Sequence, residues 1–567
     1  MRIRLRMLTG YQRGWLVKDL IAGVVLATLL VPQGMAYAEL AGLPAITGLY
    51  TTILCLLGYA VVGPSRILVL GPDSSLGPMI AATLAPLVAA DGDPQRAIAL
   101  ASMLAIMVAA ILILAAVARL GFVAELLSKP TIVGYMNGLA LTILVGQLPK
   151  LFGFSVDASG FFRELAAFVR GLADGKAVGA AVAVGLAGIA LILALQRWLP
   201  RVPAVLSAVV LSILAVQVFD LAQHGVDVIG VLPKGFPPLT LPHVRLSDLG
   251  PLAAGAFGIA LVSLADTIST ATSFAHRAGQ QVHGDQEMLG IGVANLAAAF
   301  FQGFPVSTSG SRTAVAERAG SKSQLTGVTG AGVIIVLIVL LPGLFKNLPQ
   351  PALAAVVITA ALSLADVGAT VRLWQQRRTE WALSMAALLA VVLLGVLPGI
   401  AIAVGLSILN VFRWVWRPYA TVLGRTPGLP GFHDVRSHPD AVRLPGLVLY
   451  RFDAPLIFAN AKTFSGEVLR LAGADPPPRW IVIAAEPITD VDTTATDMLT
   501  ELDETLNARG ITLAFAELKD PVRGKIERYG LTRTIDPAHL YPTVDAAVEA
   551  YLRDTGAGWP AAERLGR

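Results

Sequence analysis

The sequence has little charge and almost no cysteine for its length. Only 14% of its 567 residues are charged, whereas 55% are hydrophobic. About a quarter of the residues in a soluble protein are charged, so this composition excludes an ordinary soluble chain. Cys55 is the single cysteine and lies within an apolar run. An intramolecular disulfide is therefore excluded, and nothing indicates a disulfide-stapled extracellular domain.

Several chemical signatures are also missing from the sequence. The seven histidines are scattered, and no cluster has the spacing of metal ligands. No glycine-rich loop of the kind that cradles a phosphate is present. The net charge of +5 comes from dispersed basic residues. We therefore expect no enzyme activity, no metal, no cofactor and no nucleic-acid partner.

Long apolar runs are what the sequence contains instead. Examples are Ile98–Val117, Ala177–Leu195 and Ala382–Val396. These runs approach the roughly 20 residues that a helix needs to cross a lipid bilayer. We predict about fourteen membrane segments, which start near residues 18, 44, 74, 97, 129, 177, 203, 251, 286, 309, 325, 351, 380 and 397. The third and tenth are too short to span.

The composition changes after Arg417, where long apolar runs give way to short strand-like runs and amphipathic helices. This alternation predicts a small α/β domain. Most loops after even-numbered segments are basic, as at Arg66 and Arg372, although the region after the fifth segment is mixed. Both termini are then cytoplasmic in a multi-pass protein of the cell membrane. The predicted parts are an N-terminal segment 1–14, a membrane domain 15–417, a linker 418–444, the α/β domain 445–556 and a tail 557–567.

The two halves of the membrane domain resemble each other. In the first half, a proline-led polar stretch near Ser74 follows the segment start at Lys18. In the second half, a similar stretch near Ser309 follows the segment start at Pro251 at nearly the same spacing. Each half holds seven predicted segments, an odd number, so the second half enters the membrane from the opposite side. This arrangement predicts an inverted repeat, as in many transporters.

Polar residues at membrane depth are costly, so their positions carry information. In residues 30–39, Pro32 interrupts the helix, and Gln33 and Tyr37 lie one turn apart on one face. The alternative is a tolerated proline kink. In residues 71–78, Ser74 and Ser75 follow Asp73 as cap residues of a short helix. Its N-terminus would suit an anion, unless the Asp73 carboxylate satisfies that end or the helix is an ordinary loop helix.

The matching stretch of the second half, 303–313, contains Ser309, Gly310, Ser311 and Arg312. Arginine at this depth would attract an anion or pair with a carboxylate; the alternative is a solvated surface loop. Asp266 lies in another apolar segment, among Ser and Thr residues. It would bind a proton or sodium ion as the coupling ion, or it would only neutralise Arg312.

These stretches resemble the sulfate permease (SulP) family of anion transporters. The resemblance lies in Pro-Gln-Gly-Met-Ala-Tyr-Ala at 32–38, Gly-Pro-Asp-Ser at 71–74 and Pro-Val-Ser-Thr-Ser-Gly-Ser-Arg-Thr at 305–313. The start of the α/β domain, Tyr-Arg-Phe-Asp-Ala-Pro-Leu at 450–456, resembles a STAS domain. The resemblance covers about residues 10–555 and implies a uracil-permease-like fold with a seven-plus-seven inverted repeat, and a homodimer.

The resemblance also implies an anion site between the facing ends of half-helices three and ten. Carried over by position, the site would include Gln33, Tyr37, Ser74, Ser75, Ser309, Gly310, Ser311 and Arg312. Asp266 lies where some members place a coupling carboxylate. Some bacterial members have an acid in place of Gln33, and sodium-dependent bicarbonate members differ over 308–311. Coupling to protons or sodium therefore stays open.

In the α/β domain, Thr494 lies where some STAS domains are phosphorylated, although Asp492-Thr493-Thr494-Ala495 also fits plain helix capping, which we favour. The domain is a candidate to bind a cytoplasmic partner or a nucleotide, although it has no glycine-rich phosphate-binding loop. We predict a secondary transporter of a small sulfate-like or bicarbonate-like anion that works by alternating access. An anion channel on the same fold and a membrane-anchored STAS signalling scaffold are the alternatives.

Overall fold

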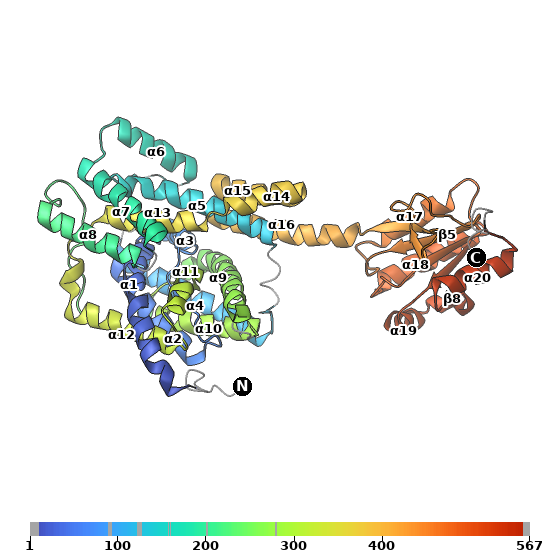
Figure 1. The fold of residues 1–567 in the computed structure, drawn as a ribbon, viewed down its shortest axis with the longest axis horizontal. Coiled ribbons are helices and arrows are strands. Elements are labelled where there is room, and N and C mark those ends of the chain that lie inside the picture. Colours follow the sequence, from blue (N-terminus) through green and yellow to red (C-terminus); the bar gives the residue numbers. More distant parts are fainter. Residues whose placement is uncertain are drawn as a thin grey trace. The chain divides into compact units, whose positions relative to one another are not determined.

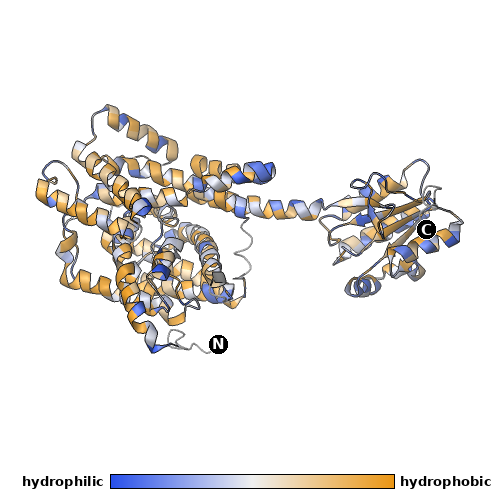
Figure 2. Ribbon diagram, viewed as in Figure 1, coloured by the Kyte–Doolittle hydropathy of each residue, from blue (hydrophilic) through white to orange (hydrophobic). Residues whose placement is uncertain are grey.

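The computed structural model describes residues 11–88, 93–121, 128–156, 158, 160–199, 202–277 and 281–559, with only the backbone of residues 276 and 277. Residues 1–10 of the predicted N-terminal segment and 560–567 of the predicted tail lie outside this range. The chain forms two compact units, Met1–Ile408 and Leu409–Arg567. The first is a helical bundle and the second a sheet with flanking helices (Figure 1). Most of the first unit is hydrophobic in Figure 2, whereas the second is mixed.

Sixteen helices precede the first long strand within the described residues. They are α1 (Leu16–Leu40), α2 (Ala45–Val62), α3 (Gly77–Val88), α4 (Pro94–Val117), α5 (Lys129–Leu151), α6 (Phe161–Ala173), α7 (Gly179–Trp198), α8 (Ala204–Phe219), α9 (Leu249–Arg277), α10 (Gly284–Ala299), α11 (Gly310–Arg318), α12 (Leu325–Leu340), α13 (Gln350–Leu364), α14 (Val367–Gln376), α15 (Arg378–Leu394) and α16 (Val396–Trp416). All fourteen predicted segments correspond to one of these helices. The helices α6 and α14 are additional.

Hydropathy does not reveal the two additional helices because both are short and amphipathic. Charged residues interrupt them, as Glu164 and Arg170 do in α6 and Arg372 does in α14. A second difference concerns Pro32, which was expected to break the first segment. The helix α1 continues through Pro32 without interruption, because a transmembrane helix tolerates proline where neighbouring groups satisfy the freed backbone.

Eight helices in the described residues are long and apolar enough to cross a membrane. The expected short segments are short in the structure: α3 has 12 residues and α11 has 9. At 1.5 Å per residue they reach about 18 Å and 14 Å, or roughly half of a 30 Å hydrocarbon layer. Both are therefore half-helices, and the backbone that precedes each one must be satisfied inside the protein.

The helix contacts follow the symmetry of a seven-plus-seven inverted repeat. When α6 and α14 are set aside, α1 to α8 correspond in order to α9 to α16. The pair α1–α12 then corresponds to the pair α9–α4, and the helices of both pairs pack together. The pair α5–α15 likewise corresponds to α13–α7, and these helices also pack together. The packing therefore supports the predicted repeat.

The same contacts sort the helices into two bundles. The core bundle contains α1–α4 and α9–α12, and the gate bundle contains α5–α8 and α13–α15. The helix α16 joins the gate bundle where Gly399 packs against Val391 of α15. The strongest contacts between the bundles are those of α1 with α8 and α13. Each bundle therefore receives half of its helices from each repeat.

The second unit is a six-stranded sheet in the order β4-β3-β5-β6-β7-β8. The strands are β3 (Ala420–Arg425), β4 (Phe432–Asp434), β5 (Leu447–Phe452), β6 (Trp480–Ala484), β7 (Thr512–Ala516) and β8 (Leu540–Tyr541). Strands β5 to β8 are parallel, and β3 is antiparallel to β4 and β5. The helices are α17 (Ala461–Ala472), α18 (Thr493–Asn507), α19 (Asp520–Tyr529) and α20 (Val544–Thr555). The sheet therefore begins within the stretch that was predicted as a linker.

A buried carboxylate from α1 holds the turn that precedes α12. Asp19 is fully buried, and its carboxylate accepts hydrogen bonds from the backbone N–H groups of Lys322 (2.6 Å) and Ser323 (3.1 Å) and from the Ser323 hydroxyl (2.7 Å). Both residues lie just before the first residue of α12, Leu325. Asp19 therefore orders the turn that leads into α12 and fixes α1 against it.

We predict that Asp19→Ala lowers the free energy of unfolding by about 3 kcal/mol, because it leaves the buried N–H and hydroxyl groups of Ser323 without their acceptor. The control is Asp93→Ala, which removes an exposed local cap of α4 that accepts from the Gln95 backbone N–H. That change should cost about 1 kcal/mol. Thermal unfolding of both purified variants in one detergent measures the difference, and equal losses would contradict the role of Asp19 in holding the turn before α12.

Candidate functional site

The two polar stretches of the repeat lie side by side as a short two-stranded sheet. Strand β1 (Leu70–Gly71) pairs antiparallel with β2 (Ser307–Thr308), with Leu70 opposite Thr308 and Gly71 opposite Ser307. Each strand runs into its half-helix, β1 into α3 and β2 into α11. This pairing, the β1–β2 crossing, satisfies the hydrogen-bonding groups of the extended backbone in the bundle interior. It also brings the N-terminal ends of both half-helices together.

The two helix ends differ in their capping. At α3, Asp73 Oδ1 accepts from the backbone N–H of Ser75 (3.0 Å) and from its hydroxyl (2.8 Å). At α11, the residue before the helix is Ser309, and it makes no side-chain capping hydrogen bond within the described structure. Its hydroxyl lies 3.0 Å from the Ser311 hydroxyl instead. The positive end of α11 is therefore the one left available to an anion.

Arg312 lies behind the crossing. Its side chain is 1% exposed. The guanidinium donates to the carbonyl oxygens of Pro72 and Gly71 and forms an ion pair with Asp73 at 3.2 Å. It therefore holds the turn before α3 in place. Of the two roles considered from sequence, the geometry matches pairing with a carboxylate, and the partner is Asp73.

A cavity of about 460 Å³ opens beside the crossing, between the two bundles. Seven of the predicted site residues line it: Gln33, Tyr37, Ser74, Asp266, Ser309, Gly310 and Ser311. Ser75 and Arg312 do not line it but contact Asp73, which does. The structure thus gathers residues from α1, α9 and both half-helices around one space.

The gate bundle supplies lining residues that the sequence reading missed. They are Met136 of α5, Gln196 of α7, Val205 of α8, and Val356, Thr359, Ala360, Ser363 and Leu364 of α13. A lone threonine or glutamine in an apolar helix was the available signal. It was too weak to use, because Thr359 also bonds the backbone of its own helix, as threonine commonly does.

Asp266 and Asp73 share one hydroxyl group. Ser75 Oγ lies 3.0 Å from Asp266 Oδ2 and 2.8 Å from Asp73 Oδ1. A serine hydroxyl has only one hydrogen to donate, so it cannot fully serve two ionised carboxylates. The ion pair of Arg312 balances Asp73. Two carboxylates therefore compete for one donated hydrogen bond beside the cavity.

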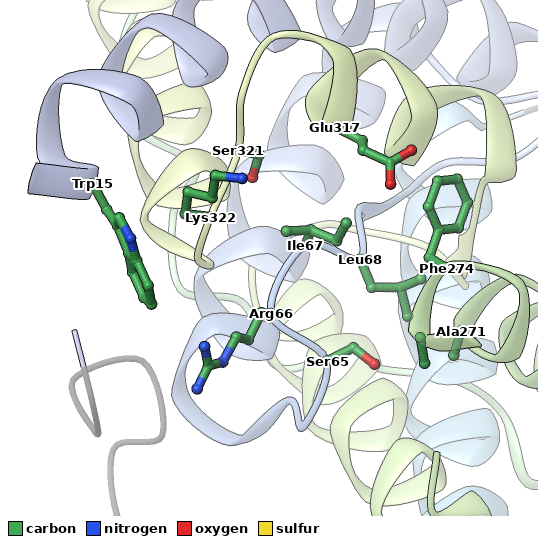
Figure 3. Close-up of a pocket in the computed structure, with 11 residues that line it drawn as sticks. Trp15, Ser65, Arg66, Ile67, Leu68, Ala271, Phe274, Glu317, Ser321 and Lys322 are labelled. Carbon is green, nitrogen blue, oxygen red and sulfur yellow. The ribbon is translucent and has the colours of Figure 1, made fainter. Parts of the chain in front are cut away.

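A separate cavity of about 220 Å³ lies in the core bundle (Figure 3). Ala271 and Phe274 line it, further along α9 than Asp266, and it shares no lining residue with the first cavity. The Arg66 guanidinium carbon lies 5.5 Å from the centre of the Trp15 ring. Tryptophan with a basic residue at helix ends is typical of a membrane–water interface, so we assign this region to the bundle surface.

In the second unit, Asp492 caps α18 by accepting from the Ala495 backbone N–H at 2.8 Å. Thr494 is exposed in the first turn of that helix. The carboxylate of Asp492 also accepts from the Phe458 backbone N–H at 2.8 Å. The capping interpretation of this motif therefore matches the geometry.

An inverted repeat with a polar cavity between two helical bundles defines a membrane transport protein. Residues 16–387 match the sulfate permease family, and residues 438–547 match the STAS domain. A probable sulfate transporter of Mycobacterium tuberculosis is 41% identical over 544 residues, 96% of each chain. Sulfate transporter 3.1 of Arabidopsis thaliana is 28% identical over 95% of this chain and 85% of its own. The chain belongs to the sulfate permease family of anion transporters and ends in a STAS domain.

Two solved structures share the fold. The murine Solute Carrier 26 family member A9 anion transporter, in its inward-facing state, gives a TM-score of 0.90 at 22% identity, over 97% of this chain and 93% of that one. The transmembrane domain of a cyanobacterium bicarbonate transporter gives 0.60 at 22% identity, over 70% and 99%. At these identities the likeness concerns the fold alone.

We predict that Arg312→Met and Asp73→Asn each destabilise the protein by about 3 kcal/mol or more, because each leaves a buried charge without its partner. The double variant should lose clearly less than the sum of the two, because it removes both charges together. Thermal unfolding of the three purified variants measures this coupling. Additive losses would show that the ion pair does not hold the crossing.

Proposed function

We propose that this chain is a secondary active transporter of a small sulfate-like or bicarbonate-like anion. The anion binds at the N-terminus of α11, in the cavity between the bundles, and crosses by alternating access. The single observation that carries the proposal is the uncapped end of α11, which the β1–β2 crossing fixes at the cavity wall. The substrate class follows the named relatives, which are sulfate and bicarbonate transporters.

The proposed site combines a helix end with neutral donors. Gly310 and Ser311 are the first two residues of α11, and both line the cavity. The hydroxyls of Ser74, Ser309 and Ser311 and the amide of Gln33 surround the same space. Neutral donors bind a small anion less tightly than an exposed arginine would, so the anion can be released again. Arg312 contributes indirectly, because it holds the turn before α3 through its ion pair with Asp73.

Asp266 is the proposed coupling residue. It faces the same cavity as the helix end, so an ionised Asp266 would repel the anion across a medium of low dielectric. A proton or sodium ion on Asp266 removes this repulsion. It also resolves the competition between Asp266 and Asp73 for the Ser75 hydroxyl. Cation and anion would therefore bind together.

Contacts at the other end of the bundles support alternating access. The cavity is lined by the C-terminal parts of α7 and α13, at Gln196 and Ser363. At the C-terminal end of α1, the Lys150 ammonium near the end of α5 lies 3.7 Å from the Glu39 carboxylate. This ion pair joins the gate bundle to the core bundle. Its breakage would accompany opening on that side.

The remaining assignments extend this proposal. Basic residues lie near the helix ends at the cavity: Arg197 is in the last turn of α7, and Arg372 and Arg378 come after the end of α13. Their positions support a cytoplasmic opening with both termini in the cytoplasm. A homodimer, a cytoplasmic partner or nucleotide at the STAS domain, and regulation at Thr494 are proposed from the family resemblance.

We predict that Gly310→Pro raises the anion concentration for half-maximal uptake by about 10- to 100-fold, because it deletes a backbone N–H that would bind a charged acceptor. Proline is tolerated at the first position of a helix, and the extended backbone of Ser309 suits a following proline. Uptake of labelled sulfate and bicarbonate into proteoliposomes, with and without pH and sodium gradients, measures the change.

Gly310→Ala is the matched control, because it adds a side chain but keeps the N–H group. A Cβ at this position would come no nearer than 4.0 Å, to the Thr270 hydroxyl. Uptake by this variant should stay within about twofold of the wild type, since an ordinary contact costs little. Equal effects of alanine and proline would contradict binding at the helix end.

Non-saturating anion current would indicate a channel, and absence of wild-type uptake would favour a scaffold.

A further inference from the structure

The cavity shown in Figure 3 lies at one end of the core bundle and shares no lining residue with the proposed anion site. Its volume is about 220 Å³. Its walls come from Trp15 before α1, from residues 65–68 between α2 and β1, from the C-terminal parts of α9 and α11, and from Ser321 and Lys322 before α12. The Arg66 guanidinium over the Trp15 ring is typical of a membrane–water interface. The head group of a membrane lipid would therefore reach this cavity.

Two cations and a run of backbone donors form one side of the cavity. Arg66 and Lys322 are exposed, and neither forms an ion pair with a carboxylate in the described part of the chain. The backbone N–H groups of Ile67 and Leu68 also donate to no acceptor among the described residues, although Leu68 is only 2% exposed. Native proteins usually satisfy such buried donors. Basic side chains beside unused N–H groups are the donors that suit a phosphate group.

A carboxylate lies on the opposite side of the cavity. Glu317 of α11 lines the cavity, and Figure 3 shows it across from Arg66 and Lys322. A carboxylate accepts several hydrogen bonds, so Glu317 has capacity for a bound cation alongside the contacts that it already makes. It would repel a ligand that carries only negative charge. The cavity is therefore complementary to a zwitterion, with the negative group at the two basic residues and the positive group at Glu317.

We propose that this cavity binds the head group of phosphatidylethanolamine, with the phosphate at Arg66 and Lys322 and the primary ammonium at Glu317. A primary ammonium has N–H donors for the carboxylate, as a lysine side chain does, whereas the quaternary ammonium of phosphatidylcholine has none. Phosphatidylglycerol has no positive charge to place beside Glu317. The inference goes beyond the proposed transport function. Because residues 65–68 lead into β1 and α11 follows β2, the bound lipid joins both sides of the β1–β2 crossing from the membrane surface.

The test compares three lipids with the same acyl chains. The thermal unfolding midpoint of the purified protein in detergent is recorded against added dioleoyl phosphatidylethanolamine, phosphatidylcholine or phosphatidylglycerol, because bound lipid stabilises the folded state. Phosphatidylethanolamine should reach half of its full shift at a concentration about tenfold lower than phosphatidylcholine, since the ammonium–carboxylate hydrogen bond adds about that factor to the affinity. Phosphatidylglycerol should also bind more weakly, because Glu317 repels it.

Variants on the two sides of the cavity should change this lipid response in different ways. Glu317→Gln should remove the advantage of phosphatidylethanolamine over phosphatidylcholine, because both lipids keep their phosphate contacts. Arg66→Gln should weaken the response to both lipids alike, and Arg66→Lys should largely retain it, because lysine keeps the charge. Arg318→Gln is the matched control: it removes an exposed charge next to Glu317 that does not line the cavity, so its lipid response should equal that of the wild type.

Several outcomes would overturn the lipid site. They are equal shifts with all three lipids, a shift with phosphatidylglycerol as strong as with phosphatidylethanolamine, and a preference for phosphatidylethanolamine that survives Glu317→Gln. Soluble phosphoethanolamine that acts at the same concentration as the lipid would show a site for a free small molecule instead. If the wild type prefers phosphatidylethanolamine but takes up neither sulfate nor bicarbonate, the lipid site stands and the proposed function fails.

Discussion

The structure depends on one constraint: two extended segments inside a membrane bundle must satisfy each other's backbone hydrogen-bonding groups. The β1–β2 crossing does this by pairing Leu70–Gly71 with Ser307–Thr308. Buried backbone that is neither helical nor closed into a barrel survives at membrane depth only when protein surrounds it. The crossing is therefore what permits α3 and α11 to be half-helices, and it creates two helix ends where a continuous helix would have none.

In the proposed mechanism, the buried ion pair between Arg312 and Asp73 determines which of these ends can bind an anion. Asp73 caps α3 and is neutralised by Arg312 from the other half-helix. One positive end is thus used internally, while the end of α11 faces the cavity without a cap in the described structure. A symmetric repeat therefore produces an asymmetric site. In the proposed mechanism, this asymmetry lets the anion and the cation at Asp266 occupy neighbouring positions.

Much of this arrangement was predictable from sequence because it depends on local patterns. Apolar length revealed the fourteen segments, and polar residues at matching depths revealed the two half-helices that the structure brings together. The amphipathic helix α6 and the strand β3 carried no comparable signal, because charged residues interrupt the apolar pattern of α6 and β3 is a short run that ends in Gly424 and Arg425.

Long-range partners were not predictable in the same way. From the sequence, the partner of Arg312 was predicted to be either an anion or a carboxylate. The structure shows that the partner is the carboxylate of Asp73. The hydrogen bonds between Asp19 and the turn before α12 join residues about three hundred positions apart. Thr359 resembles an ordinary residue of an apolar helix until the gate bundle places it beside the cavity. A chemical role that depends on two bundles meeting has no local signature.

The most direct test of the account asks whether a transported anion occupies the space beside α11. Cys55 is fully buried, so a new cysteine at Thr270, which lines the cavity beside Gly310, would be the main target of a polar thiol reagent. The account predicts that sulfate or bicarbonate slows modification of Thr270→Cys in a saturable manner and leaves exposed Ser247→Cys unaffected. Equal modification rates at Thr270→Cys with and without every transported anion would contradict it.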